Sequence, residues 1–205
     1  MIKKNKIFKD NYCNKNLFVY SILFTMLFVI LFILMKLNIS TKLDVVINLF
    51  FVSIQTNFLV SLFLIITELG SSIFVGIVSI FVAIYLYVNK SFKALKIFIS
   101  AIVIELGVVY ILKHLISRIR PFNTLKTLFS FPSGHAAISI VFLGFISWFF
   151  WNKNKFVSYT MWVLILLIGI SRLVLNMHWF TDVLAGYAIG LAILSFCVFF
   201  YNNYF

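Results

Sequence analysis

Long apolar runs recur along the whole chain, and they constrain its fold more than any other feature does. Several runs reach about 18 or more residues, which is enough for a helix to cross a hydrocarbon core of roughly 30 Å. Hydrophobic residues make up 63% of the 205 residues, whereas an ordinary soluble domain is about half apolar. The sequence therefore predicts an integral membrane protein whose core is an all-α helix bundle facing lipid.

Six of these runs are expected to span the membrane and to form one domain over residues 1–205. The expected spans are residues 17–35, 72–88, 97–116, 134–151, 156–172 and 181–201. Between the first two spans, the mixed stretch 36–57 suits an amphipathic helix at the membrane interface. Residues 57–68 suit a second short helix, interfacial or re-entrant. The predicted fold is thus all-α: a six-transmembrane-helix bundle with short interfacial helices between the first and second spans.

Lysines gather at alternate ends of the predicted spans. They are Lys3, Lys4, Lys6, Lys9 and Lys15 before the first span, Lys90, Lys93 and Lys96 after the second, and Lys153 and Lys155 after the fourth. Positively charged loops stay in the cytoplasm, so these groups mark the cytoplasmic side and place both termini there. The formal net charge of +12 follows this topology, and we therefore expect no nucleic-acid partner.

Three polar blocks stand out in the second half, because charged residues are costly to keep in so apolar a chain. They are residues 113–121 (KHLISRIRP), 132–135 (PSGH) and 171–182 (SRLVLNMHWFTD). All three fall at the outer ends of the third to sixth predicted spans. The topology rests on lysines outside these blocks, so their convergence on the extracytoplasmic face is an independent indication of one shared site.

The first block holds two cations, Lys113 and Arg120, seven residues apart. If the third helix continues that far, two turns place both on one face. Arginine offers a phosphoryl group a planar fork and lysine offers it a point charge. Pro121 is expected to end the segment. Taken alone, the block fits a snorkelling lysine and an interfacial arginine equally well.

The second block precedes a long apolar run, and Ser133 is its expected N-cap. Gly134 lets a ligand approach the backbone closely, and unpaired N–H groups at a helix start bind anions. His135, in the first turn, is placed to give a proton to a departing oxygen. An ordinary capped helix start with an interfacial histidine is the alternative for this block.

The third block holds His178 and Asp182, four residues apart. A shared helix face would let Asp182 accept a hydrogen bond from one imidazole nitrogen and leave the other as a nucleophile. Arg172 adds a third cation to the predicted phosphate cradle. A pair that only caps the sixth span is the alternative, but together the three blocks supply every role that phosphoryl transfer needs.

With these residues in place, the sequence resembles the type 2 phosphatidic acid phosphatase superfamily. That family's signature reads K-x6-RP, PSGH and SR-x5-H-x3-D, and all three parts stand here without a departure, within residues 113–182. The resemblance implies a membrane lipid phosphatase that needs no metal and no other cofactor. The first 100 residues carry no part of the signature.

The resemblance also implies a role for each site residue. His178 attacks phosphorus, Asp182 orients it, and His135 protonates the leaving oxygen and then helps to activate water. The phosphate oxygens are held by Lys113, Arg120 and Arg172, assisted by Ser133 and the Gly134 N–H.

The expected partners are the bilayer and a lipid phosphomonoester or diphosphate. Phosphatidylglycerophosphate, phosphatidate and undecaprenyl diphosphate are all candidates, because the motif reads only the phosphate. A lipid phosphotransferase would use the same site, and a non-catalytic lipid transporter or scaffold is a further alternative. The same superfamily includes vanadate-dependent haloperoxidases. Those enzymes are soluble, so the six predicted spans argue against a haloperoxidase. No oligomeric state is predicted.

Four further polar residues lie outside the fixed positions of the signature. We interpret Arg118 as a loop cation or headgroup contact and His114 as structural. Glu105 is expected to bond a polar group deeper in the bundle or to relay protons. Glu68, with Gly70, is expected to shape a helix break near the lipid entrance.

Overall fold

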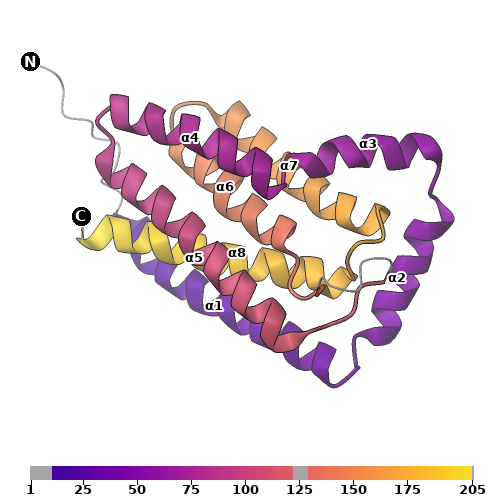
Figure 1. The fold of residues 1–205 in the computed structure, drawn as a ribbon. Helices are drawn as coiled ribbons and strands as arrows, with labels where there is room; N and C mark the ends of the chain where they lie inside the picture. Colours follow the sequence, from indigo (N-terminus) through magenta and orange to yellow (C-terminus); the bar gives the residue numbers. More distant parts are fainter. Residues whose placement is uncertain (1–10, 122–128, 205) are drawn as a thin grey trace, which may run out of the picture.

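The computed structural model describes residues 11–121 and 129–204, and over these residues it is all-helical, with no strand (Figure 1). Its helices are α1 (Asn11–Lys36), α2 (Thr41–Ser53), α3 (Asn57–Glu68), α4 (Ser72–Val88), α5 (Phe92–Ile116), α6 (Gly134–Phe150), α7 (Lys155–Val174) and α8 (Phe180–Tyr204). The predicted all-α class is confirmed. Lys3, Lys4, Lys6 and Lys9, which support the cytoplasmic N-terminus, lie outside the described residues, as does 122–128 of the outer loop.

Four of the described helices are long and apolar enough to cross a membrane: α1 from Asn16 onward, α5, α7 and α8. The α2–α3 pair passes the same test as a unit but is bent by 117°, so it is a broken span or a re-entrant pair. The two other apolar helices, α4 and α6, have 17 residues each. The chain is therefore a membrane protein with four or five candidate spans among its described residues, and the six-span count stays a prediction.

Local sequence signals explain where several helices begin. The side chains of Thr56, Ser71 and Asn154 each accept a hydrogen bond from a backbone N–H in the first turn of the helix that follows, which are α3, α4 and α7. Such caps satisfy N–H groups that have no partner within the helix. The helices expected between the first and second spans exist as α2 and α3, and their interfacial location stays a prediction.

The core is built around α6, in which eleven of 17 residues are buried. It packs between α7 and α8, with α5 beside it, and α8 packs along α1 on its other side (Figure 1). Glycines on α8 make the close approach possible. A Cβ at Gly190 would lie 2.7 Å from the Ala137 carbonyl oxygen and 2.8 Å from the Ile140 Cβ.

One end of this bundle collects the polar blocks. The end of α5, the start of α6, the end of α7 and the start of α8 meet there, and α2 and α3 flank the same end (Figure 1). Helices α4 and α5 are joined by a short turn at the opposite end and diverge toward this one. The polar end is thus bordered by helices from both halves of the chain.

Candidate active site

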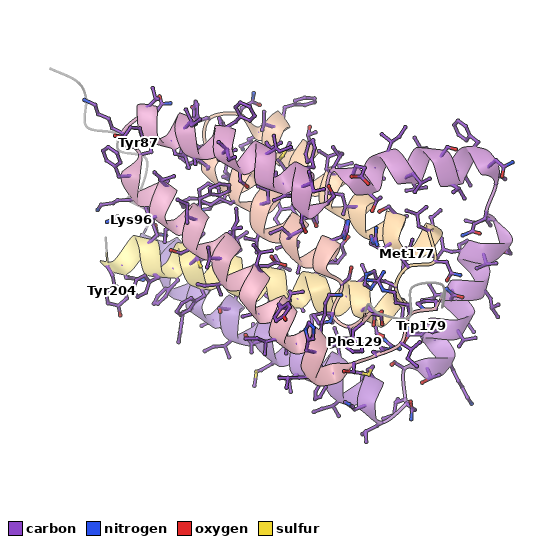
Figure 2. The ribbon with its side chains drawn as sticks, viewed as in Figure 1. Tyr87, Lys96, Phe129, Met177, Trp179 and Tyr204 are labelled. Carbon is purple, nitrogen blue, oxygen red and sulfur yellow. The ribbon has the colours of Figure 1, made fainter. Side chains whose placement is uncertain are left out.

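A cavity of about 360 Å³ lies at the polar end of the bundle, in the region marked by Phe129, Met177 and Trp179 in Figure 2. Six of the eight predicted site residues line it: Lys113, Arg120, Gly134, His135, Arg172 and His178. The other two, Ser133 and Asp182, are fully buried behind it. The structure therefore brings the three separate sequence blocks together around one space.

The first block reaches the cavity by a route that differs from the prediction. Helix α5 ends at Ile116, and Ser117 adopts the left-handed conformation with φ 53°, which stops a helix. The helix thus ends where the predicted third span ends, and the condition for a shared helix face, that the helix continues to Arg120, is not met. Both cations still line the cavity, and the Lys113 ammonium donates to the Phe129 carbonyl oxygen at 2.9 Å.

The second block starts α6 as expected, with Ser133 at the N-cap position. However, its side chain makes no capping bond, so that part of the expectation is wrong. Its backbone N–H donates to the Asp182 carbonyl oxygen at 2.9 Å, which ties the start of α6 to α8. Among the described residues its buried hydroxyl has no hydrogen-bond partner. Gly134 and His135 line the cavity in the first turn, where backbone N–H groups have no partner within the helix.

The third block places His178 in the loop before α8, which begins at Phe180. The His–Asp pair is therefore formed by a loop residue and a residue of the first helical turn, and the expected shared helix face is wrong. The pair itself is present: Nδ1 of His178 lies 3.5 Å from Oδ2 of Asp182, and both side chains are buried. Because Nδ1 is the buried nitrogen, Nε2 is the one left for the cavity.

Burial also sets the protonation of His178. It lowers the pKa of the imidazole to about 4, although the nearby carboxylate of Asp182 acts in the opposite direction. A buried histidine favours the neutral form because a charge is poorly solvated there. His178 is therefore neutral near pH 7 and keeps a lone pair on one ring nitrogen.

Asp182 has two further partners that the sequence did not indicate. Its Oδ2 accepts from the Trp179 backbone N–H at 2.9 Å, and its Oδ1 accepts from Nη1 of Arg118 at 2.5 Å. Arg118 also bonds Asp44 of α2 at 2.7 Å. Arg118 lies in the loop after α5, as interpreted, but its guanidinium is held between two buried acids, a role that the sequence did not indicate.

Helix α3 and its junction with α4 add a wall that carries no part of the signature. Nη1 of Arg172 donates to the buried Thr67 hydroxyl at 2.6 Å. Gly70 lies close to His135, since a Cβ on this glycine would be 3.3 Å from the ring Cδ2. The sequence carries no signal for the role of Thr67, and it predicts Gly70 only as part of a helix break.

Two residues outside the signature also line the cavity. Glu105 is buried on α5, two turns before Lys113, and faces the same space. His114 lines the cavity as well, and its Nδ1 lies 2.8 Å from the Tyr110 carbonyl oxygen. The cavity thus contains an acid and a third histidine besides the predicted groups.

An all-helical membrane protein with three cations and two signature histidines around one cavity has the form of a phosphate-handling membrane protein. Residues 94–205, more than half of the chain, match the family model of the PAP2 superfamily. The chain belongs to this superfamily, which confirms the resemblance seen in its three sequence blocks.

Two curated relatives match part of the chain. Phosphatidylglycerophosphatase B of Bacillus subtilis is 40% identical over 91 residues, which are 40% of this chain and 45% of the relative. Lipid A 1-phosphatase of Porphyromonas gingivalis is 32% identical over 87 residues, 42% of this chain and 19% of the relative. The matched region thus spans less than half the length of these curated relatives.

Solved structures extend the likeness beyond that region. A transmembrane PAP2-type phosphatidylglycerolphosphate phosphatase from Bacillus subtilis superposes with a TM-score of 0.79 at 25% identity, covering 87% of this chain and 94% of the other. LpxE from Aquifex aeolicus gives a TM-score of 0.61 at 25% identity, covering 77% and 93%. The fold of the first half is therefore shared where the signature is absent.

Proposed function

We propose that this protein is a lipid phosphatase that hydrolyses a lipid phosphomonoester or diphosphate through a phosphohistidine intermediate. The observation that carries the proposal is the cavity itself, where three cations and the two signature histidines gather in an apolar bundle. Groups of this kind in a membrane protein usually serve function, because burying them is costly. The similarity to phosphatidylglycerophosphatase B and lipid A 1-phosphatase supports a phosphate carried on a lipid.

In the first step of the proposed reaction, Nε2 of His178 attacks phosphorus and a nitrogen–phosphorus bond forms. The bond from phosphorus to the lipid oxygen breaks, and His135 gives its proton to that oxygen. Asp182, facing Nδ1 at 3.5 Å, stabilises the positive charge that develops on the ring. Charge on the transferring phosphoryl oxygens is stabilised by Lys113, Arg120 and Arg172.

In the second step, water attacks the phosphohistidine while His135 takes a proton from it. The nitrogen–phosphorus bond breaks, inorganic phosphate leaves, and His178 is neutral again. Side chains supply the positive charge around the phosphate in both steps, and on this ground we propose that hydrolysis needs no metal. Ser133 and the Gly134 N–H assist at the start of α6.

The lining of the cavity supports sideways entry of the lipid between α4 and α5. Gly70 and Ser72 border one side, and Leu106 and Tyr110, which are 50% and 65% exposed, border the other. The two helices diverge toward this end (Figure 1). At about 360 Å³, the cavity is at the small end of ligand pockets and suits a phosphorylated headgroup whose tails stay in the bilayer.

We further propose a multi-pass protein of the cell membrane with six spans, cytoplasmic termini and an extracytoplasmic site. A cysteine placed at exposed Lys90, in a variant without the two native cysteines, should resist an impermeant thiol reagent until cells are permeabilised. A cysteine at Ile119, 69% exposed beside the site, should react in intact cells. The reverse pattern would place the site on the cytoplasmic side.

The decisive experiment measures phosphate release from three lipids under one set of conditions. Phosphatidylglycerophosphate is the favoured substrate, given the names of two Bacillus subtilis relatives, with phosphatidate and undecaprenyl diphosphate as the comparisons. Reconstituted protein should release phosphate in excess EDTA, and His178→Ala should abolish this release. The control is Lys42→Gln, an exposed change on α2.

Three results would count against the proposal. A strict need for an added divalent metal would contradict the mechanism, and full activity of the His178→Ala variant would contradict the nucleophile. Transfer of the phosphoryl group to added glycerol in place of water would identify a phosphotransferase. No turnover of any lipid phosphate by the folded wild type would favour a transporter or scaffold.

A further inference from the structure

Helix α2 comes from the part of the chain without a signature, yet it sends one carboxylate into the polar end of the bundle. Asp44 is 1% exposed. Its Oδ1 accepts from the Thr181 backbone N–H at 2.9 Å, and its Oδ2 accepts from the Thr181 hydroxyl at 2.7 Å. Both oxygens are thus fixed against the first turn of α8, one residue before Asp182.

The same carboxylate holds Arg118. Nη2 of Arg118 lies 2.7 Å from Oδ2 of Asp44, while Nη1 donates to Asp182 at 2.5 Å and to the Thr181 hydroxyl at 2.8 Å. The guanidinium also lies over the Trp179 ring, 5.5 Å from its centroid. A planar cation bonded on two edges and stacked on one face has little freedom to rotate.

Arg118 in turn limits the movement of Asp182. It occupies Oδ1, whereas Oδ2 accepts from the Trp179 N–H and faces Nδ1 of His178. The position of the guanidinium therefore determines how the carboxylate is turned toward the imidazole. An arginine bonded to Asp182 alone would follow that carboxylate as it moved, but Asp44 anchors the arginine to a different helix.

We propose that Asp44 is a positioning residue: it holds Arg118 against Asp182 and so fixes the carboxylate that orients His178. The inference rests on the proposed function, in which His178 attacks phosphorus. It assigns a part in the reaction to α2, whose only buried residue is Asp44. Among the described residues no hydrogen bond joins Asp44 to His178, so its effect on the imidazole passes through Arg118.

Two other contacts, one of α2 and one of the link that follows it, provide an internal comparison. The Asn48 side-chain amide on α2 donates to the Asn176 side chain, and the side chain of Gln55, just after α2, donates to the Val174 carbonyl oxygen. Both contacts attach this region to the place where α7 ends and the His178 loop begins. Neither involves Arg118, so Asn48→Ala weakens the attachment of α2 without changing the charges around Asp182.

The test compares Asp44→Asn, Asn48→Ala and the exposed control Lys42→Gln in proteoliposomes with phosphatidylglycerophosphate. Asparagine keeps the shape of aspartate but turns a donor toward the donors of Arg118, which displaces the guanidinium. We expect kcat to fall on the order of 10- to 100-fold, the size of effect that a misplaced catalytic group produces. KM should stay within about threefold, because the cations that bind phosphate are not altered.

A double-mutant cycle separates positioning from general loss of structure. If Asp44 acts through Arg118, the double variant with Asp44→Asn and Arg118→Met should be no slower than Arg118→Met alone. The proposal would be overturned if the double variant showed the product of the two single-variant losses in kcat. It would also be overturned by a wild-type kcat in folded Asp44→Asn, by a rise in KM as large as the fall in kcat, or by an equal loss in Asn48→Ala. Lys42→Gln should match the wild type.

A second variant keeps the inference testable where Asp44→Asn does not accumulate in the membrane. Asp44→Glu keeps the charge and moves the carboxylate by one methylene, so kcat should fall less, again with KM unchanged. Wild-type kcat in that variant would overturn the proposal. An inactive wild type would contradict the proposed function, whereas an active wild type, an inactive His178→Ala and a fully active Asp44→Asn would contradict this inference alone.

Discussion

Two regions of the chain bury different kinds of residue. Of the most apolar window of α8, 61% is buried within the protein, against 11% of that of α1. The buried residues of α6 are mostly apolar, whereas Asp44 and Thr67 are the only buried residues of α2 and α3. Helices α6 and α8 thus lie at the centre of the core, whereas α2 and α3, in the first half of the chain, contribute polar contacts to the site.

The physical reason lies in the solvent. Lipid tails are as apolar as leucine side chains, so burying an apolar helix face against protein gains little in a bilayer. Hydrogen bonds and close packing then decide where a helix docks. Asp44 and Thr67 each bond an arginine of the site region, Arg118 and Arg172, so two polar contacts link the less buried half to the site.

The largest effect is expected where the second half supplies charge to the site. Arg172→Met removes a cation from the cavity, and kcat/KM should fall about 10²- to 10³-fold, as when one electrostatic donor is lost from an active site. Phosphate release from reconstituted protein measures this. The control is Lys153→Met, an exposed change at the other end of the bundle. A loss in kcat/KM below tenfold would show that Arg172 does not bind the phosphate.

A smaller effect is expected at a close packing contact of the second half. Gly190→Ala forces a methyl group against the backbone of α6, and overpacking of this kind costs about 1–3 kcal/mol. The melting temperature in detergent should drop. The matched control is Gly107→Ala on α5, where no described atom lies within 4 Å of the added Cβ. Equal melting temperatures would show that α6 and α8 can separate without loss of stability.

The contribution of Thr67 on α3 to the site should be smaller again. Thr67→Val keeps the size of the side chain but removes the hydroxyl that accepts from Arg172. Losing this bond, worth about 1 kcal/mol, should raise KM for the lipid phosphate roughly three- to tenfold. Thr67→Ser restores the hydroxyl and should restore KM. An unchanged KM in the Thr67→Val variant would show that Thr67 on α3 has no part in phosphate binding.

The smallest effect is expected on the surface of the first half. Gly76 on α4 has no described neighbour within 4 Å of a built Cβ, so Gly76→Ala meets no obstacle. Stability should change by less than about 1 kcal/mol, in the direction that favours helix. Melting temperature and phosphate release should both stay near the wild type. A marked loss would show that α4 packs more closely than its exposure indicates.

The helices and most of the site could be predicted because their signals are local. Apolar runs and polar caps such as Thr56 and Ser71 set the limits of α3 and α4 at the predicted residues. Six of the eight predicted site residues line one cavity. These residues were found because the chemistry of phosphate restricts which side chains serve it and how they are spaced.

The rest depended on contacts that no local pattern encodes. Ser117 carries no signal for the left-handed conformation that ends α5 before Arg120. Arg118 pairs with an acid 74 residues away, and Arg172 bonds a hydroxyl 105 residues away. Such pairs follow from how the helices pack in three dimensions, so the parts played by α2 and α3 became visible only in the fold.

The position of the cavity mouth has a kinetic consequence. In the proposed sideways entry, the lipid passes the exposed α5 residues Leu106 and Tyr110, so the substrate diffuses in two dimensions and never through water. The rate then depends on the surface concentration of the lipid phosphate, which is its fraction among the lipids of the membrane. Dilution with inert phospholipid slows turnover even when the amount per millilitre is constant, and half-saturation is a mole fraction.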